Sequence, residues 1–291
     1  MSSIDLSNEP VMPPVLGSGI SLWVQQALAI FRIEFKKALF SRSAFAIYAL
    51  ASMPLLIYSI SAYESIHDSE SVFGNIDDAR RVFGQVFSTL ILGGVIYLGS
   101  ASLFIALFRG EMLARSIHYY LLTPVRREVL VAGKFLAGMT AAIFLFTACT
   151  LLCFILMYLP FGMGQLITDI TTGIAVLQMG QYLGIIFLAV LGYGSVFMAA
   201  GLLFRNPIIP IVLISAWEFL HFILPPWLKM FSIIHYLKGL LPIPIDEGPL
   251  AVIVAPPPLW VSILGMLMVS AIMLAASITI LRKLEVHYTD E

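Results

Sequence analysis

The sequence predicts an all-α polytopic membrane protein, in which six transmembrane helices follow an amphipathic interfacial helix and both termini are cytoplasmic. Three observations support this fold class. Of the 291 residues, 60% are hydrophobic and only 11% are charged, whereas a soluble domain carries about 25% charged residues. Six apolar runs have roughly the 20-residue length that a bilayer requires. Most of the cations lie in the connections on one side of the predicted membrane. The net charge of −1 gives no reason to expect a nucleic-acid partner.

The N-terminal region divides into a disordered cytoplasmic tail, residues 1–19, and an amphipathic interfacial helix, residues 20–41. The tail is polar, contains prolines and lacks the apolar centre of a signal peptide. Residues at helical spacing separate into an apolar side and a polar side, which favours a helix in the headgroup plane: Val24, Leu28, Phe31, Phe35 and Ala38 against Gln25, Arg32 and Lys36. Glu34 interrupts this pattern. The alternative is a juxtamembrane extension of the first span.

The six-helix transmembrane domain occupies residues 42–282, and residues 283–291 form a cytoplasmic tail. We predict its spans at 43–63, 83–108, 134–160, 176–204, 207–225 and 257–281. With both termini inside, twelve cations lie in cytoplasmic segments and four in outer segments, which is the orientation that the positive-inside rule favours. Small residues at Gly180 and Gly184 give one candidate surface for close helix packing.

The connector 109–134, between the second and third spans, is long, charged and free of a turn cluster. Such a connector is a surface rather than a simple link, so we expect a cytoplasmic coupling loop on which another protein acts. Five charged residues are the candidate docking contacts: Glu111, Arg115, Arg126, Arg127 and Glu128. The alternative is ordinary positive-inside topology, which explains the sign of these charges but not the length of the segment.

Two ionisable residues, Glu218 and His221, share one face of the fifth span. Charges within a span are costly and suggest cation binding, proton transfer or cargo contact. The structural alternative is that Glu218 hydrogen-bonds another span near Gln178 or Gln181, with His221 close to the outer interface. The outer segment 226–256 is too apolar for a free loop and too rich in proline for a span, which predicts one or two short interfacial or re-entrant helices.

The sequence lacks recognisable enzyme chemistry. Gly133-Lys134-Phe135 has neither the hydroxyl residue nor the upstream glycine of a phosphate loop. The five histidines are scattered, so no metal-ligand cluster is expected. Cys149 and Cys153 lie four apart in an apolar run, which indicates core packing. We therefore expect a chain that is not an enzyme and binds no cofactor itself.

Over most of its length the chain resembles the membrane (permease) subunit of ABC-2 type ATP-binding-cassette transporters. The resemblance rests on the six-span architecture and on three stretches: GEMLA at 110–114, YYLLTPVRREVLVAGK at 119–134 and FSIIHYLKGLLP at 231–242. It implies a second permease copy, as homodimer or heterodimer, and cytoplasmic ATPase subunits that carry ATP and Mg. It also implies a bacterial-type plasma (inner) membrane, docking of the ATPase on 109–134 and, usually, export between two permeases.

Two other functions are compatible with the residues. One is an ion-coupled secondary transporter that uses Glu218 and His221, although residues 43–160 and 176–281 show no clear repeat of the kind common in such transporters. The other is a non-transport membrane scaffold. An intramembrane enzyme is a weaker alternative, because no catalytic constellation is recognisable.

Overall fold

The computed structural model describes residues 20–67, 74–113, 125–220, 223–243 and 257–283, and all regular secondary structure within them is helical. Within these described ranges, five helical stretches are long and apolar enough to cross a membrane: Ala44–His67, Ile76–Met112, Arg127–Phe161, Ile174–Leu203 and Leu259–Lys283. The prediction of an all-α membrane protein is thereby confirmed. The predicted count of six spans is not confirmed, because the fifth prediction corresponds to a shorter helix.

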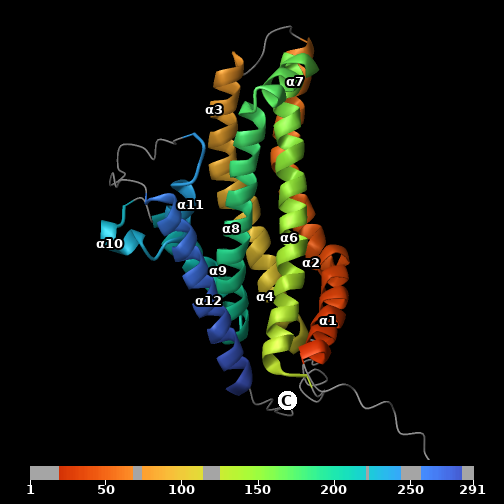
Figure 1. Cartoon of the computed structure of the whole chain (residues 1–291), viewed down its shortest axis with the longest axis vertical. Helices are drawn as coiled ribbons and strands as arrows, with labels where there is room; N and C mark the ends of the chain where they lie inside the picture. Colours follow the sequence, from red (N-terminus) through yellow and green to blue (C-terminus); the bar gives the residue numbers. More distant parts are fainter. Residues whose placement is uncertain (1–19, 68–73, 114–124, 221–222, 244–256, 284–291) are drawn as a thin grey trace, which may run out of the picture.

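The described helices run as a bundle with one long axis (Figure 1). In chain order they are α1 (Ile20–Phe40), α2 (Arg42–His67), α3 (Ile76–Val86), the π-helix η1 (Phe87–Ile96), α4 (Tyr97–Leu113), α6 (Arg127–Tyr158), the 3₁₀ turn η2 (Leu159–Phe161), α7 (Met163–Thr171), α8 (Ile174–Leu203), α9 (Ile208–Phe219), α10 (Pro226–Lys229), α11 (Ile233–Lys238) and α12 (Leu259–Lys283). The tails 1–19 and 284–291 and the residues 244–256 of the outer segment lie outside the described residues.

The predicted interfacial helix corresponds to α1, which lies beside the first turns of α6 along the long axis of the bundle (Figure 1). Its buried residues are Ile30 and Glu34, whereas Val24 and Leu28 of the predicted apolar side are each 50% exposed. Phe35 and Ala38 of that side do pack against the core, so only part of the predicted apolar side of α1 faces the protein. The interfacial helix and the helical extension of the first span both stay predictions.

The second predicted span is one part of a longer helical rod formed by α3, η1 and α4. Asn75 begins this rod, because its side-chain oxygen accepts hydrogen bonds from the backbone N–H groups of Asp77 and Asp78 at 3.0 and 2.9 Å. At 37 residues, Ile76–Met112 extends about 55 Å at 1.5 Å per residue. The hydrocarbon core of a bilayer is about 30 Å thick, so the rod is long enough to continue beyond it.

The fifth predicted span, 207–225, corresponds to α9, which follows the predicted turn and has Pro207 as its N-cap. Its 12 residues give a length of about 18 Å, which is too short to cross a bilayer core. The outer segment that follows contains two short helices, α10 and α11, as predicted for its first part. In α11 the apolar side chains of Ile233, Ile234 and Leu237 are buried.

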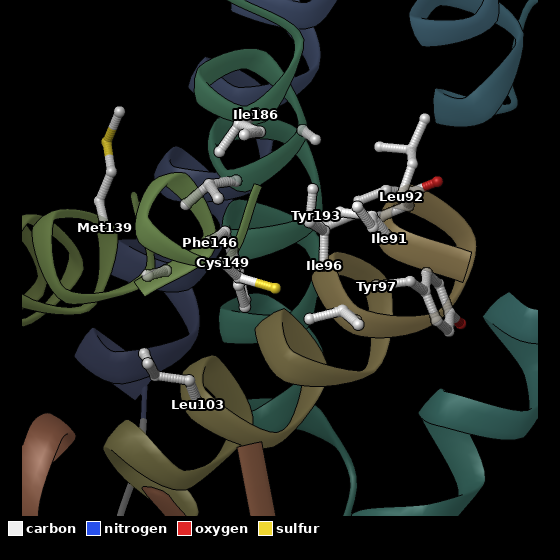
Figure 2. Packing of buried hydrophobic residues seen from close by; sticks show 14 of the residues in the cluster. Ile91, Leu92, Ile96, Tyr97, Leu103, Met139, Phe146, Cys149, Ile186 and Tyr193 are labelled. Atoms are coloured by element: carbon white, nitrogen blue, oxygen red, sulfur yellow. The ribbon is translucent and has the colours of Figure 1, made fainter. Parts of the chain in front are cut away.

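The core lies between α2, the η1–α4 rod, α6 and α8. Figure 2 shows apolar side chains from the η1–α4 rod, α6 and α8 packed together. Phe146 of α6 fits against Gly99 of α4, and the thiols of Cys149 and Cys153 are buried and unbridged, in agreement with their predicted packing role. At Gly201 of α8 a Cβ would meet the Cα of Ile105 at 3.0 Å. Glycine therefore allows the backbones of α8 and α4 to approach closely here. Gly180 and Gly184, in contrast, face open space.

Candidate functional site

A buried ammonium group joins three helices at the end of the bundle where α6 begins. The side chain of Lys134 is fully buried, and its Nζ lies 2.7 Å from Glu34 Oε1 of α1 and 2.7 Å from Glu111 Oε1 of α4. It also donates a hydrogen bond of 2.9 Å to the carbonyl oxygen of Leu107. One cation in the third predicted span therefore holds α1, α4 and α6 together.

A second ammonium group completes the arrangement, which we call the Lys134 cluster: Glu34, Lys37, Glu111 and Lys134. Lys37 Nζ lies 3.3 Å from Glu111 and 3.8 Å from Glu34, and its side chain is half exposed. Two carboxylates thus face two ammonium groups, so the cluster is electrically balanced. Burial acts to raise the pKa of Glu34, but the charge and hydrogen bond of Lys134, with smaller contributions from Glu111 and Lys37, lower the pKa below its ordinary value.

The local sequence explains how Lys134 reaches α1. Gly133, the preceding residue, packs against α1, where a Cβ would lie 3.1 Å from Ile30 Cγ2 and 3.2 Å from the carbonyl oxygen of Ala27. Only a residue without a side chain allows this approach unchanged. Glu34 interrupts the polar–apolar pattern of α1 because it faces the protein rather than water. That interruption was the sequence signal for the cluster.

The predicted docking contacts occupy different environments. Glu111 is only 3% exposed and pairs with Lys134, so it lies inside the bundle rather than on its surface. Arg126 is exposed and lies over the Trp23 ring, 4.2 Å from its centroid. Glu128 pairs with Arg282, and Arg127 donates a hydrogen bond to the carbonyl oxygen of Leu281. Arg115 lies outside the described residues.

The predicted coupling loop 109–134 is longer than the connector in the structure. Helix α4 continues to Leu113 and α6 begins at Arg127, so charged residues at both ends of the predicted loop belong to the long helices. The reason is pairing: Glu111 and Lys134 neutralise each other inside the bundle, which lets both helices continue as buried structure. Residues 114–124, between these helices, lie outside the described residues.

Glu218, predicted as an intramembrane polar candidate, binds the outer segment. Its carboxylate accepts hydrogen bonds from the Ser232 hydroxyl at 2.8 Å and from the backbone N–H groups of Ile233 and Ile234, each at 2.9 Å. Tyr193 of α8 donates a further contact at 3.5 Å. These partners differ from the glutamines near 178–181 proposed by the structural alternative, but they are structural in kind. His221 lies outside the described residues.

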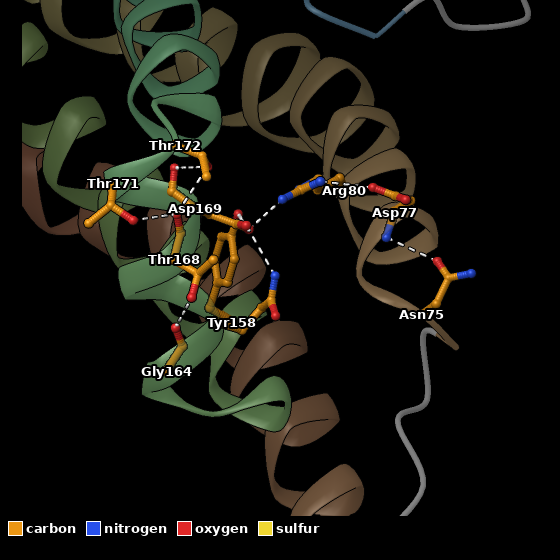
Figure 3. A network of polar contacts seen from close by, with 10 residues as sticks. Asn75, Asp77, Arg80, Tyr158, Gly164, Thr168, Asp169, Thr171 and Thr172 are labelled. Carbon is orange, nitrogen blue, oxygen red and sulfur yellow. Dashed lines mark hydrogen bonds and ion pairs between the residues drawn. The ribbon is translucent and has the colours of Figure 1, made fainter.

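A second buried polar network, which no local sequence pattern indicates, lies at the opposite end of the bundle (Figure 3). Asp169 of α7 pairs with Arg80 of α3 and accepts hydrogen bonds from Tyr158 at 2.8 Å and from Gln165 at 3.1 Å. Arg80 also pairs with Asp77 at 2.8 Å. We call Arg80, Tyr158, Gln165 and Asp169 the Asp169 network. It fastens α3 to the end of α6 and to α7.

No model of a known protein family matches the chain, and no curated protein sequence matches it significantly. Within the described residues, no group of three or more His, Cys, Asp or Glu side chains is arranged to hold a metal ion. A function must therefore be argued from three features: the Lys134 cluster, the exposed Arg126 beside it, and the contacts of Glu218.

Proposed function

We propose that the chain is the transmembrane permease subunit of an ATP-driven ABC-2 type transporter, and that it exports cargo. In this proposal two permease copies enclose the cargo path in a bacterial-type inner membrane, with both termini of each copy in the cytoplasm. A separate cytoplasmic ATPase subunit binds ATP and Mg and pushes on the connector between α4 and α6. The chain itself hydrolyses nothing.

The observation that carries the proposal is the Lys134 cluster. Both helices that flank the connector, α4 and α6, meet α1 through one buried ammonium group. A force on the connector would therefore be shared by three helices at once, rather than bending one helix end. Removing one partner from a buried ion pair typically costs about 3–5 kcal/mol. Separating the three helices would break such pairs, so we expect the helices to move as a unit.

The surface beside the Lys134 cluster supports the same proposal. Arg126 is exposed at the start of α6, next to Trp23 of α1, and Arg32 and Lys36 of α1 are also exposed. These cations are available to acidic side chains of a protein partner. Of the predicted docking residues, we retain Arg126, Arg127 and Glu128, together with Arg115, and we remove Glu111.

The experiment that tests the proposed function is purification of the tagged chain from its native host in mild detergent, followed by identification of the proteins that remain bound. A stoichiometric cytoplasmic ATPase with a phosphate loop supports the proposal. Repeated recovery of the chain without an ATPase, under conditions that preserve known transporter complexes, contradicts it and leaves the ion-coupled transporter and the scaffold.

The ion-coupled alternative depends on Glu218 being available to a cation or a proton. Its carboxylate instead accepts hydrogen bonds from the Ser232 hydroxyl and from two backbone N–H groups at the start of α11. A carboxylate with this many donors is well suited to holding a short helix in place. The observed contacts therefore favour a structural role for Glu218 over ion coupling.

A further inference from the structure

A cavity of about 190 Å³ opens beside the Lys134 cluster, between α1, α2 and α4. Its lining includes Glu34, Lys37, Ala38, Ala44, Ala106 and Glu111. It is smaller than the roughly 300 Å³ at which pockets for drug-sized ligands begin. Its size suits one polar headgroup or a fragment of that size.

The lining divides into a polar part and an apolar part. Glu34 and Glu111 supply carboxylates that are 1% and 3% exposed, and Lys37 supplies a half-exposed ammonium group. Apart from Ser41, the remaining wall is apolar and largely made of small residues, among them Ala38, Ala44 and Ala106. A ligand that fits this lining has a charged end and an apolar continuation, as a membrane lipid does.

The cavity also lies at the depth where a lipid headgroup is found. Exposed cations on α1, such as Arg32 and Lys36, and Arg126 at the start of α6 mark the water line at this end of the bundle. Lys134 is eight positions into the helix from Arg126, about 12 Å at 1.5 Å per residue. Arg32 and Lys36 lie two positions before and two positions after Glu34, so the Lys134 cluster and the cavity beside it lie at the level of this water line.

We propose that this cavity binds the headgroup of a zwitterionic phospholipid that carries a primary amine, of the phosphatidylethanolamine class. The contacts of Lys37 with the two carboxylates, at 3.3 and 3.8 Å, are longer than the 2.7 Å contacts of Lys134. The lipid amine takes the place of Lys37 beside Glu111 and donates hydrogen bonds to it. Lys37 turns to the lipid phosphate, so the charge balance of the cluster is preserved.

The requirement for an amine follows from the chemistry of the carboxylates. A primary ammonium group has three N–H donors for carboxylate oxygens, whereas the trimethylammonium group of phosphatidylcholine has none. An anionic headgroup such as phosphatidylglycerol places negative charge near two buried carboxylates. The bound lipid would join α1 to α2 and α4 and so reinforce the attachment that Lys134 makes. This inference rests on the membrane location of the chain and not on the proposed transport function.

The test is native mass spectrometry of the full-length chain in detergent with equimolar phosphatidylethanolamine, phosphatidylcholine and phosphatidylglycerol of identical acyl chains. We expect one phosphatidylethanolamine per chain, retained about tenfold better than phosphatidylcholine, since one charge-assisted hydrogen bond accounts for a factor of this order. Equal retention of the two lipids, or preferential retention of phosphatidylglycerol, would overturn the proposal.

Two substitutions that fill the cavity locate the lipid. Ala106→Leu narrows it from α4 and Ala38→Leu narrows it from α1, so that a folding defect in one variant leaves the other to decide. We expect each folded variant to lose the selective adduct by about tenfold. The matched control is Ala46→Leu, at an exposed position of α2 that is not part of the lining. An adduct unchanged in the cavity-filling variants, or lost equally in the control, would overturn the assignment.

Discussion

The ammonium nitrogen of Lys134 lies 2.7 Å from Glu34 Oε1, although the two residues are 100 positions apart in the chain. The same ammonium contacts Glu111 at 2.7 Å. Both carboxylates are buried away from water, and a buried charge is costly unless it is paired. Each carboxylate therefore depends on the positive charge of Lys134. The junction of α1, α4 and α6 is therefore the point at which a single substitution has the largest expected effect.

The first prediction concerns this junction. Lys134→Met leaves two buried carboxylates beside Lys37 alone, and we expect the free energy of unfolding to fall by about 3–5 kcal/mol. Thermal unfolding of the purified protein in detergent measures the loss. Lys36→Met, at an exposed position of α1, is the matched control and should have little effect. Equal melting temperatures for the two variants would show that the cluster does not stabilise the fold.

The second prediction is a dependence on pH. Burial acts to raise the pKa of Glu34, but Lys134, Glu111 and Lys37 together lower it by more, so the folded pKa lies below the ordinary value of 4.5. A lowered pKa contributes stability that is complete above 4.5 and is lost as pH falls through the folded value. The difference in melting temperature between the wild type and Glu34→Gln should therefore be constant near neutral pH and shrink in acid. A difference that grows on acidification would contradict the assigned shift.

The third prediction uses two glycines of the same helix. Gly201→Ala places a Cβ 3.0 Å from the Cα of Ile105, and backbone cannot move aside as a side chain can. We expect a loss of about 1–3 kcal/mol from overpacking. Gly184→Ala meets nothing within 4 Å and should be neutral or gain up to about 1 kcal/mol from helix propensity. Unfolding measurements that rank the two variants in the opposite order would refute the packing of α8 on α4.

The fourth prediction concerns the Asp169 network. Arg80→Ala removes the cation that faces Asp169, a residue only 4% exposed, and should cost about 3 kcal/mol or more. Arg81→Ala is the control, because that side chain is 75% exposed and should change stability by less than about 0.5 kcal/mol. Similar melting temperatures for both variants would mean that the network adds no stability.

The fifth prediction distinguishes a structural role of Glu218 from a direct role in transport. Glu218→Gln keeps the shape but replaces one acceptor oxygen by an NH₂ group, so one of the N–H donors of α11 faces another donor. We expect a loss of about 1–3 kcal/mol, together with faster hydrogen exchange at Ile233 and Ile234. Glu64→Gln, at an exposed position of α2, is the control. Normal stability combined with lost transport would instead assign Glu218 a direct role in cargo or ion movement.

The long apolar helices were predictable because composition and length suffice to identify them. The contacts that organise the bundle were not, since they join distant residues: Glu34 with Lys134, and Arg80 with Asp169, which are 89 positions apart. Of these four residues, only Glu34 interrupted a local sequence pattern, and this interruption indicated a buried partner. Polar residues near helix ends, such as Glu111, were read as surface because pairing across the bundle leaves no local pattern.

The fifth span shows a different limit of sequence reasoning. The apolar run continues beyond Leu220, whereas α9 ends at Phe219. Glu218 contributes to this difference through tertiary contacts, because its carboxylate accepts hydrogen bonds from backbone groups at the start of α11. Hydrophobicity alone does not indicate such a contact. The short helices of the outer segment, in contrast, were predictable from its mixture of apolar residues and prolines.

The central claim is that a cytoplasmic ATPase acts on the connector at the α6 end of the bundle. The most direct measurement replaces Arg126 by a photo-crosslinking amino acid, illuminates the intact native membrane and identifies the crosslinked protein. The same amino acid at Arg81, near the opposite end and also exposed, serves as the control. We predict an adduct with a phosphate-loop ATPase from position 126 and none from position 81. No ATPase adduct at 126, or one at 81, would contradict the account.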